Sequence, residues 1–201
     1  HPKLPEMIKY ISDRGILDLK INTNATRLDD KLAYSILENN VSELVFSVDA
    51  GTKETYEQIR VLGKFDKVVQ NIKNFKYIRD KHFKKSKCIT RIAGVKVKKE
   101  QNIDQMVSFW KKYVDEVSIK PATPRWDSYN NEPINIKHSC SQLWERMYVW
   151  YDGKINPCDF DYKSFLSVGN IKNNSLEEIW NSKEYNSLRK KHLEKKRSDC
   201  F

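Results

Sequence analysis

Two cysteines and a glycine in the last third of the chain have a spacing that could serve a metal centre. Cys140, Gly153 and Cys158 are arranged as C-x12-G-x4-C. Asp152-Gly153 is a strong hairpin-turn signal, so the chain is expected to cross back and bring the two thiols near one another. A disulfide or two inert buried cysteines would also fit, but nothing else in the sequence indicates the oxidising compartment that a disulfide needs. Metal or cluster ligation is therefore favoured.

A second set of candidate residues lies where the expected strands end. Asn22-Thr23-Asn24 closes one strand, Ser47 and Asp49 close the next, and Lys120 closes a third. Period-two alternation places Ser47 and Asp49 on one face of their strand. The opposite face is apolar to its end, with Leu44, Phe46 and Val48. Buried polar groups are often structural, so the pattern alone leaves a ligand site and a hydrogen-bonded structural role equally open.

Hydrophobic periodicity indicates the elements that position these residues. The spacing predicts strands over 17–24, 43–49, 87–97 and 116–120, and helices over 3–14, 29–40, 53–60, 65–82 and 103–114. Alternation with short connections predicts parallel strands joined by right-handed crossovers, hence a barrel or a doubly wound sheet. In both folds, functional groups gather at the carboxyl ends of the strands.

A change of pattern divides the chain after the fourth strand. Residues 122–139 contain two prolines, two adjacent asparagines and no apolar periodicity, so we place a linker there, between domains over 1–121 and 140–201. The second domain is predicted to hold a hairpin around Asp152-Gly153 and helices near 175–181 and 184–196. Ser175 with Glu178 has the spacing of a capping box at the first of these helices.

Composition excludes several classes of protein. The chain has 37 Lys and Arg against 27 Asp and Glu, a net charge of +10, but the charges are dispersed and nucleic-acid binding is not expected. No segment approaches the ~20 apolar residues of a membrane span, and no leader opens the chain, which favours a cytoplasmic protein without a membrane partner. The sequence has no glycine-rich phosphate loop, nucleophile elbow or His-Glu-x-x-His signature, which argues against hydrolytic chemistry.

The order of several motifs resembles that of radical S-adenosylmethionine (radical SAM) enzymes with a cysteine-rich SPASM extension. Residues 22–28, 45–50, 56–60 and 65–68 resemble the third and fourth strand regions of that family's barrel. Cys140, Gly153 and Cys158 fit the first half of a SPASM extension, and residues 168–171 and 175–182 resemble the segment that follows it. Cys200 stands where a later cysteine group would begin.

The resemblance implies a fold and a chemistry. The fold is the C-terminal half of a partial (β/α)6-type barrel, followed by a small α+β iron–sulfur domain. The implied reaction is reductive cleavage of S-adenosylmethionine to a 5′-deoxyadenosyl radical that abstracts a substrate hydrogen. The C-x3-C-x2-C loop of the catalytic [4Fe-4S] cluster is expected upstream of His1, so the chain is interpreted as an interior fragment, cut at both ends, that is inactive alone.

The resemblance also assigns site residues. Ser47 would bond a ribose hydroxyl, Asp49 would assist or touch substrate, and Arg60 would meet the methionyl carboxylate or a substrate anion. Asn24 is a further, weaker cofactor candidate. The ligands of one or more auxiliary [4Fe-4S] clusters would be Cys140, Cys158 and Cys200. Cys88 has no partner at ligand spacing and is expected to be a small buried hydrophobe.

Substrate and partners follow from the same resemblance only in general terms. The expected substrate is a peptide, a protein side chain or a small metabolite, and the expected electron donor is a reductant such as flavodoxin or ferredoxin. Two alternatives stay open. One is a non-catalytic module that keeps the fold for binding, and the other is a zinc-stabilised partner-binding protein, since zinc accepts the same thiolates.

Overall fold

The computed structural model describes residues 1–122 and 138–196. The chain divides into two compact units, His1–Ala122 and Thr123–Phe201, each of which is described by itself. The expected linker over 122–139 lies almost wholly outside the described residues, and the domain limits over 1–121 and 140–201 stay a prediction.

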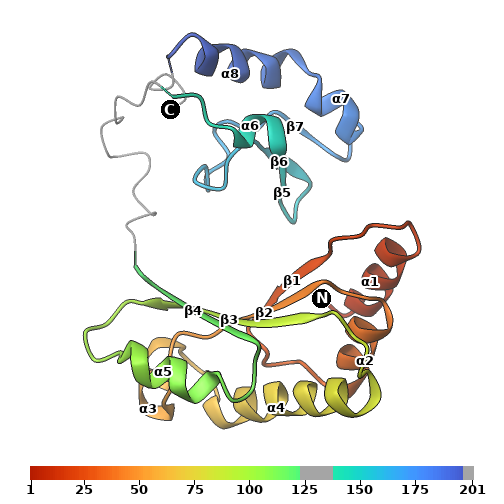
Figure 1. The fold of residues 1–201 in the computed structure, drawn as a ribbon. Helices are drawn as coiled ribbons and strands as arrows, with labels where there is room; N and C mark the ends of the chain where they lie inside the picture. Colours follow the sequence, from red (N-terminus) through yellow and green to blue (C-terminus); the bar gives the residue numbers. More distant parts are fainter. Residues whose placement is uncertain (123–137, 197–201) are drawn as a thin grey trace. The chain divides into compact units, whose positions relative to one another are not determined.

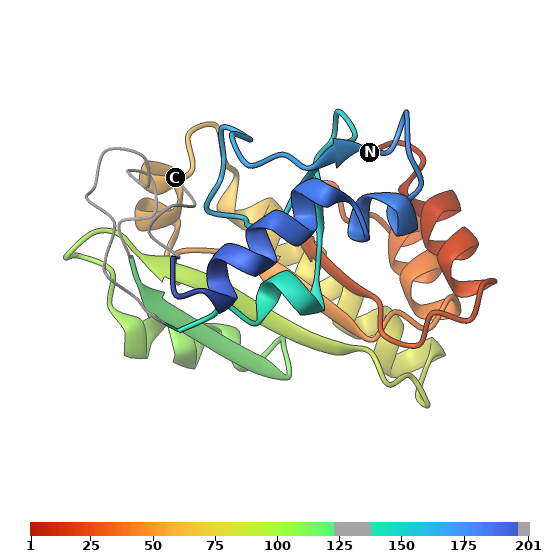
Figure 2. The ribbon, with the colours of Figure 1, turned by 90° about the horizontal axis from the view of Figure 1, so that it is seen from above.

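The first unit alternates helix and strand throughout. Its elements are α1 (Leu4–Ser12), β1 (Lys20–Thr23), α2 (Asp30–Glu38), β2 (Glu43–Ser47), α3 (Lys53–Ile59), α4 (Phe65–His82), β3 (Ile89–Lys96), α5 (Ile103–Trp110) and β4 (Glu116–Pro121). The four strands form one parallel sheet in the order β1-β2-β3-β4. The helices of this unit lie on one face of the sheet (Figures 1 and 2). The α/β class predicted from the sequence is confirmed.

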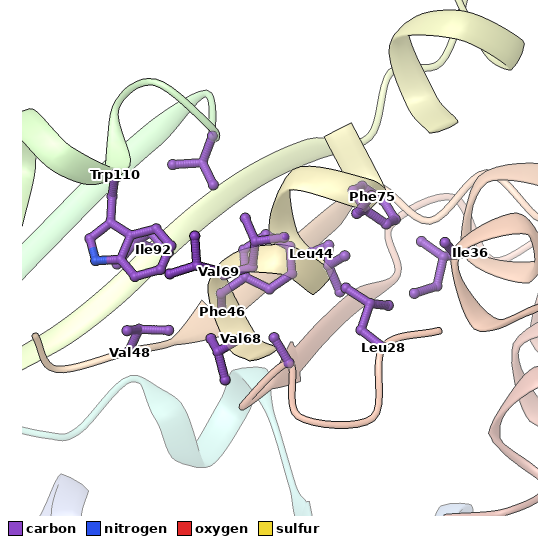
Figure 3. Close-up of a cluster of buried hydrophobic side chains, with 14 of the residues drawn as sticks. Leu28, Ile36, Leu44, Phe46, Val48, Val68, Val69, Phe75, Ile92 and Trp110 are labelled. Carbon is purple, nitrogen blue, oxygen red and sulfur yellow. The ribbon is translucent and has the colours of Figure 1, made fainter. Parts of the chain in front are cut away.

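The core of this unit lies between the sheet and its helices. Leu44, Phe46 and Val48 of the β2 segment are fully buried, as the alternation of that strand predicts. They pack with apolar residues of α4 and α5 (Figure 3), which include Val68, Ile72, Phe75 and Trp110. The indole Nε1 of Trp110 donates to the carbonyl oxygen of Ala50 at 2.8 Å, which fixes the segment just beyond β2.

Two element limits of the first unit differ from the sequence prediction by three or four residues. β1 begins at Lys20 rather than at residue 17, because Lys20 is the residue that pairs with Glu43, where the neighbouring strand starts. Leu17 is 93% exposed, so its apolar side chain does not mark a buried strand position, although the sequence pattern suggested one. Helix α5 ends at Trp110 instead of residue 114.

The second unit is smaller and has less regular structure. It contains α6 (Gln142–Glu145), β5 (Tyr148–Val149), β6 (Lys154–Asn156), β7 (Gly169–Asn170), α7 (Leu176–Trp180) and α8 (Lys183–Leu193). The strands form an antiparallel sheet in the order β5-β6-β7. The predicted hairpin is confirmed, with Gly153 at a φ of +89°, and so is the Ser175–Glu178 capping box. Strand β7 has two residues, too few to give a periodic signal.

Candidate cofactor and cluster sites

Asp49 lies just beyond the carboxyl end of β2 and is 7% exposed. Its Oδ1 accepts the backbone N–H of Val95 in β3 at 2.8 Å, and its Oδ2 accepts Nε of Arg60 at 2.8 Å. The Arg60 Nη2 lies 2.5 Å from the same oxygen. Both carboxylate oxygens are thus engaged, so Asp49 joins two strand ends and holds Arg60.

Arg60 follows the last residue of α3, where it is the C-terminal cap of the helix. Its side chain is 40% exposed, and Asp49 takes two of the five N–H donors that a guanidinium carries. The remaining donors suit a further anion, because guanidinium groups bind carboxylates with paired hydrogen bonds. Burial raises the pKa of the neighbouring Tyr56 phenol, and the Arg60 cation acts in the opposite direction.

Gln101 completes this corner of the sheet, and sequence reasoning missed it. It is 2% exposed. Its Nε2 donates to the carbonyl oxygens of Asp49 at 2.5 Å and Val95 at 2.8 Å, while its Oε1 accepts the N–H groups of Val97 and Lys98, each at 2.6 Å. This amide therefore binds the turn after β3 to the segment after β2. A single glutamine in a polar run carries no periodic signal that could have identified it.

Ser47 and Asn24 lie at the ends of neighbouring strands but differ in whether their side chains already form hydrogen bonds. Ser47 is the half-buried last residue of β2, paired in register with Ala93, and its hydroxyl has no hydrogen-bond partner among residues 1–122 and 138–196. The Oδ1 of Asn24 instead accepts the N–H of Thr26 at 3.1 Å and its hydroxyl at 2.8 Å, closing a turn in which Ala25 has a φ of +60°. Asn24 thus has a local role in forming this turn.

Cys140 and Cys158 lie in the second unit as half-buried free thiols. The N–H of Cys140 donates to Nδ1 of His192 in α8 at 3.1 Å, and His192 is 5% exposed. Burial raises the pKa of Cys158, while hydrogen bonds from the backbone N–H groups of Phe160 and Asp161 lower it. The charge of Cys140 also acts on this pKa, so the two thiols lie within electrostatic range of each other.

These two thiols fit an iron–sulfur cluster. N–H donors directed at a sulfur stabilise its thiolate and tune the cluster that it would hold. In the described ranges, no group of three or more His, Cys, Asp and Glu residues gathers as a metal site. Cys200 lies outside those ranges. Zinc could be held by the same two sulfurs, so the donor set alone does not select iron.

Cys88 behaves differently from the other two. It is 4% exposed, and burial raises the pKa of its thiol to about 11. The structure therefore confirms the expectation of a small buried hydrophobe.

Among the described residues, no helix is both long enough and apolar enough to cross a bilayer.

The chain matches two family models. Residues 1–109 match the radical SAM superfamily, and residues 140–201 match SPASM, described as an iron–sulfur cluster-binding domain. The cofactors of this family are S-adenosylmethionine and [4Fe-4S] clusters. In sequence, the chain matches none of the curated proteins.

Solved structures share the fold at low identity. SuiB of Streptococcus suis bound to S-adenosylmethionine is 16% identical, with a TM-score of 0.65 over 92% of this chain and 52% of that one. The protein anSMEcpe with bound AdoMet is 16% identical, with a TM-score of 0.61 over 84% and 55%. BtrN in complex with AdoMet and 2-DOIA is 16% identical, with a TM-score of 0.54 over 98% and 63%. The chain thus spans about half the length of the first two structures.

The observed fold and the two family matches support the same assignment. The four-stranded parallel sheet is part of a radical SAM barrel, and a small SPASM segment follows it. Because the superfamily model covers more than half of its residues, this chain belongs to the radical SAM superfamily.

Proposed function

We propose that this chain supplies the S-adenosylmethionine-binding mouth and the first auxiliary-cluster ligands of a radical SAM enzyme. The observation that carries this proposal is the pair of half-buried free thiols, Cys140 and Cys158, inside the segment that matches an iron–sulfur domain. The ligands of the catalytic cluster would come from residues outside this chain. The coverage of 52% of SuiB and 55% of anSMEcpe supports that division.

The barrel residues would bind and orient the cofactor. S-adenosylmethionine, when bound to a reduced [4Fe-4S] cluster, supplies the radical chemistry. The hydroxyl of Ser47, which has no hydrogen-bond partner in the described part of the chain, suits a ribose hydroxyl. Arg60 would bind the methionyl carboxylate with the donors that Asp49 leaves unused, while Asp49 holds the guanidinium in place instead of touching the substrate. Asn24 would shape the neighbouring turn and contribute only its amide donors.

A peptide is the proposed substrate, because two similar structures were solved with peptides. SuiB bound to the precursor peptide SuiA has a TM-score of 0.59 at 15% identity, and anSMEcpe with the Kp18Cys peptide has 0.58 at 19% identity. A small metabolite is the alternative, supported by BtrN with 2-DOIA. We propose flavodoxin or ferredoxin as the reductant and the cytoplasm as the compartment, since free thiol ligands need reducing surroundings.

Metal and sulfide analysis tests this function. The parent protein, meaning the in-frame protein that contains this chain, is purified without oxygen beside Cys140→Ala, Cys158→Ala and Cys88→Ala variants. We expect the first two variants to lose about four iron and four sulfide atoms per protein, the content of one [4Fe-4S] cluster. The Cys88→Ala variant is the matched control and should keep its iron. Zinc without sulfide in the wild-type protein, or equal iron in all variants, would contradict the proposal.

A further inference from the structure

The loop that carries Cys158 is closed by two completely buried polar side chains. Asn156, the last residue of β6, and Asp161 are both 0% exposed. Between them lie Pro157, which has no N–H and ends the strand, then Cys158 itself, Asp159 and Phe160. Burying a polar group costs free energy unless it is hydrogen-bonded, so the bonds of these two residues indicate their role.

Asn156 acts on the loop through its amide nitrogen. Its Nδ2 donates to the carbonyl oxygen of Asp161 at 2.8 Å and to the hydroxyl of Ser164 at 3.1 Å. Its Oδ1 is buried and has no hydrogen-bond partner in the described part of the chain. A buried acceptor left unpaired is unfavourable, and an apolar side chain would fill the space without that cost. The presence of an asparagine at this buried position is therefore explained by the two hydrogen bonds that its Nδ2 donates to the loop.

Asp161 organises the loop from its other end. Its Oδ1 accepts the N–H of Phe165 at 2.9 Å, and its Oδ2 accepts the N–H of Leu166 at 2.8 Å. The N–H of Ser164 donates to the Asp161 carbonyl oxygen at 3.1 Å, and Ser164 has a φ of +61°. A non-glycine residue adopts that conformation at an energetic cost, so the loop is held in a shape that its sequence does not prefer locally.

We propose that Asn156 and Asp161 are positioning residues for an iron–sulfur ligand, which hold the loop so that the N–H groups of Phe160 and Asp161 are directed at the Cys158 sulfur. This inference rests on the proposed function and deepens it. Burial raises the pKa of the Cys158 thiol, and hydrogen bonds from the backbone N–H groups of Phe160 and Asp161 act against that rise. Hydrogen bonds to cluster sulfurs stabilise the reduced, more negative state, so this loop raises the reduction potential of the cluster that Cys158 helps to hold.

The reduction potential tests the inference. The parent protein is used with the cysteines of its upstream cluster loop replaced by Ala, so that the auxiliary clusters alone are loaded, and potentials are measured by anaerobic titration. We expect Asn156→Ala and Asp161→Asn to lower the reduced-to-oxidised ratio at a fixed potential about tenfold, equivalent to about 59 mV for one electron. Asp152→Asn is the matched control, since Asp152 lies in the hairpin turn of the same unit and accepts the N–H of Lys154. Its potential should equal that of the wild type.

A milder variant covers the case in which a buried substitution prevents cluster loading. Ser164→Ala removes one acceptor of Asn156 at a half-buried position and should shift the potential in the same direction, by less. Wild-type potentials in every loaded loop variant would overturn the inference, as would failed loading of Asn156→Ala and Asp161→Asn beside an unchanged Ser164→Ala. Iron that survives Cys158→Ala would instead overturn the proposed function, so the two failures are distinguishable.

Discussion

The two units of this chain bury polar groups in different ways. In the first, Asp49 and Gln101 tie strand ends together above an extensive apolar core; the parallel sheet places Ser47, and the Asp49 carboxylate holds Arg60. In the second, the hydrophobic core comprises Leu143, Ile155, Val168, Ile179 and Tyr185, and the cysteines are held by buried polar side chains. The sheet brings the segments of the first candidate site together and side-chain hydrogen bonds fix them, whereas the second candidate site depends on hydrogen bonds within a loop.

This contrast indicates which unit depends on its cofactor for an ordered structure. A sheet with an extensive core keeps its strand ends in place whether or not a ligand is bound. A small unit with short strands gains much of its stability from a bound cluster, because metal binding and folding are coupled. Loss of the cofactor should therefore destabilise the cysteine unit more than the first unit.

Removal of the clusters should give the largest contrast. We expect amide hydrogen exchange in residues 140–196 to accelerate about 100-fold or more when the clusters are extracted anaerobically, since binding free energy contributes to folding there. Exchange in β2 and α4 should change little, and these elements are the internal control. Equal protection of both units before and after extraction would contradict the comparison.

Truncation of Trp110 tests the apolar core of the first unit. Trp110→Ala removes a side chain that is 0% exposed, together with its bond to Ala50, and should lower the free energy of unfolding by about 3–5 kcal/mol. Tyr77→Ala is the control, because Tyr77 is 54% exposed, and it should cost about 1 kcal/mol or less. Denaturant unfolding of the parent protein measures both. Similar losses of unfolding free energy in the two variants would show that this apolar core does not dominate the stability of the first unit.

His192 offers a finer test of the cysteine unit. His192→Phe fills the volume without an acceptor for the Cys140 N–H, and we expect about tenfold faster loss of iron to a chelator, the lower end of the range for residues that support metal ligands. His192→Asn can place an acceptor near the position of Nδ1 and should restore much of the retention. Identical rates for both variants would show that the hydrogen bond has no role.

Asp115 gives an effect confined to acidic pH, on the stability of the first unit. Burial opposes its ionisation, but hydrogen bonds from Arg79 and Thr90 outweigh burial and lower the pKa of the carboxyl from 3.8 to about 2. A lowered pKa stabilises the folded state above pH 3.8, and this contribution is lost as the pH falls through about 2. The wild type should therefore lose its stability advantage over Asp115→Asn between pH 4 and 2, measured by unfolding across about that range. A difference in unfolding free energy between the two proteins that stays constant over this pH range would contradict the lowered pKa of Asp115.

The sequence predicted what depends on repeating patterns. Alternating polarity placed Leu44 and Phe46 in the core and Asp49 at the strand end, and the Asp152-Gly153 turn identified the hairpin. Side-chain pairing could not be predicted in the same way. The bond between Asp49 and Arg60 depends on where α3 ends, so the sequence pattern could not indicate that the Asp49 carboxylate supports Arg60.

The supports of the cysteine loop were beyond sequence prediction for a related reason. Asn156 and Asp161 lie in a segment whose strands have two or three residues, too short for periodicity to indicate which side chains are buried. Polar residues near a turn are ordinarily read as exposed, yet both are 0% exposed. Their contribution becomes visible only when the loop closes on itself in three dimensions.

The most direct test of the account is reductive release of 5′-deoxyadenosine from S-adenosylmethionine by the parent protein. We expect release by the reduced, cluster-loaded wild type, and a several-fold rise in the S-adenosylmethionine concentration that gives half-maximal release in Arg60→Ala, because the proposed carboxylate contact is lost. Lys53→Ala, which removes an exposed cation of α3, should leave that concentration unchanged. A fully loaded protein that releases no 5′-deoxyadenosine, or an Arg60→Ala variant with wild-type behaviour, would contradict the account.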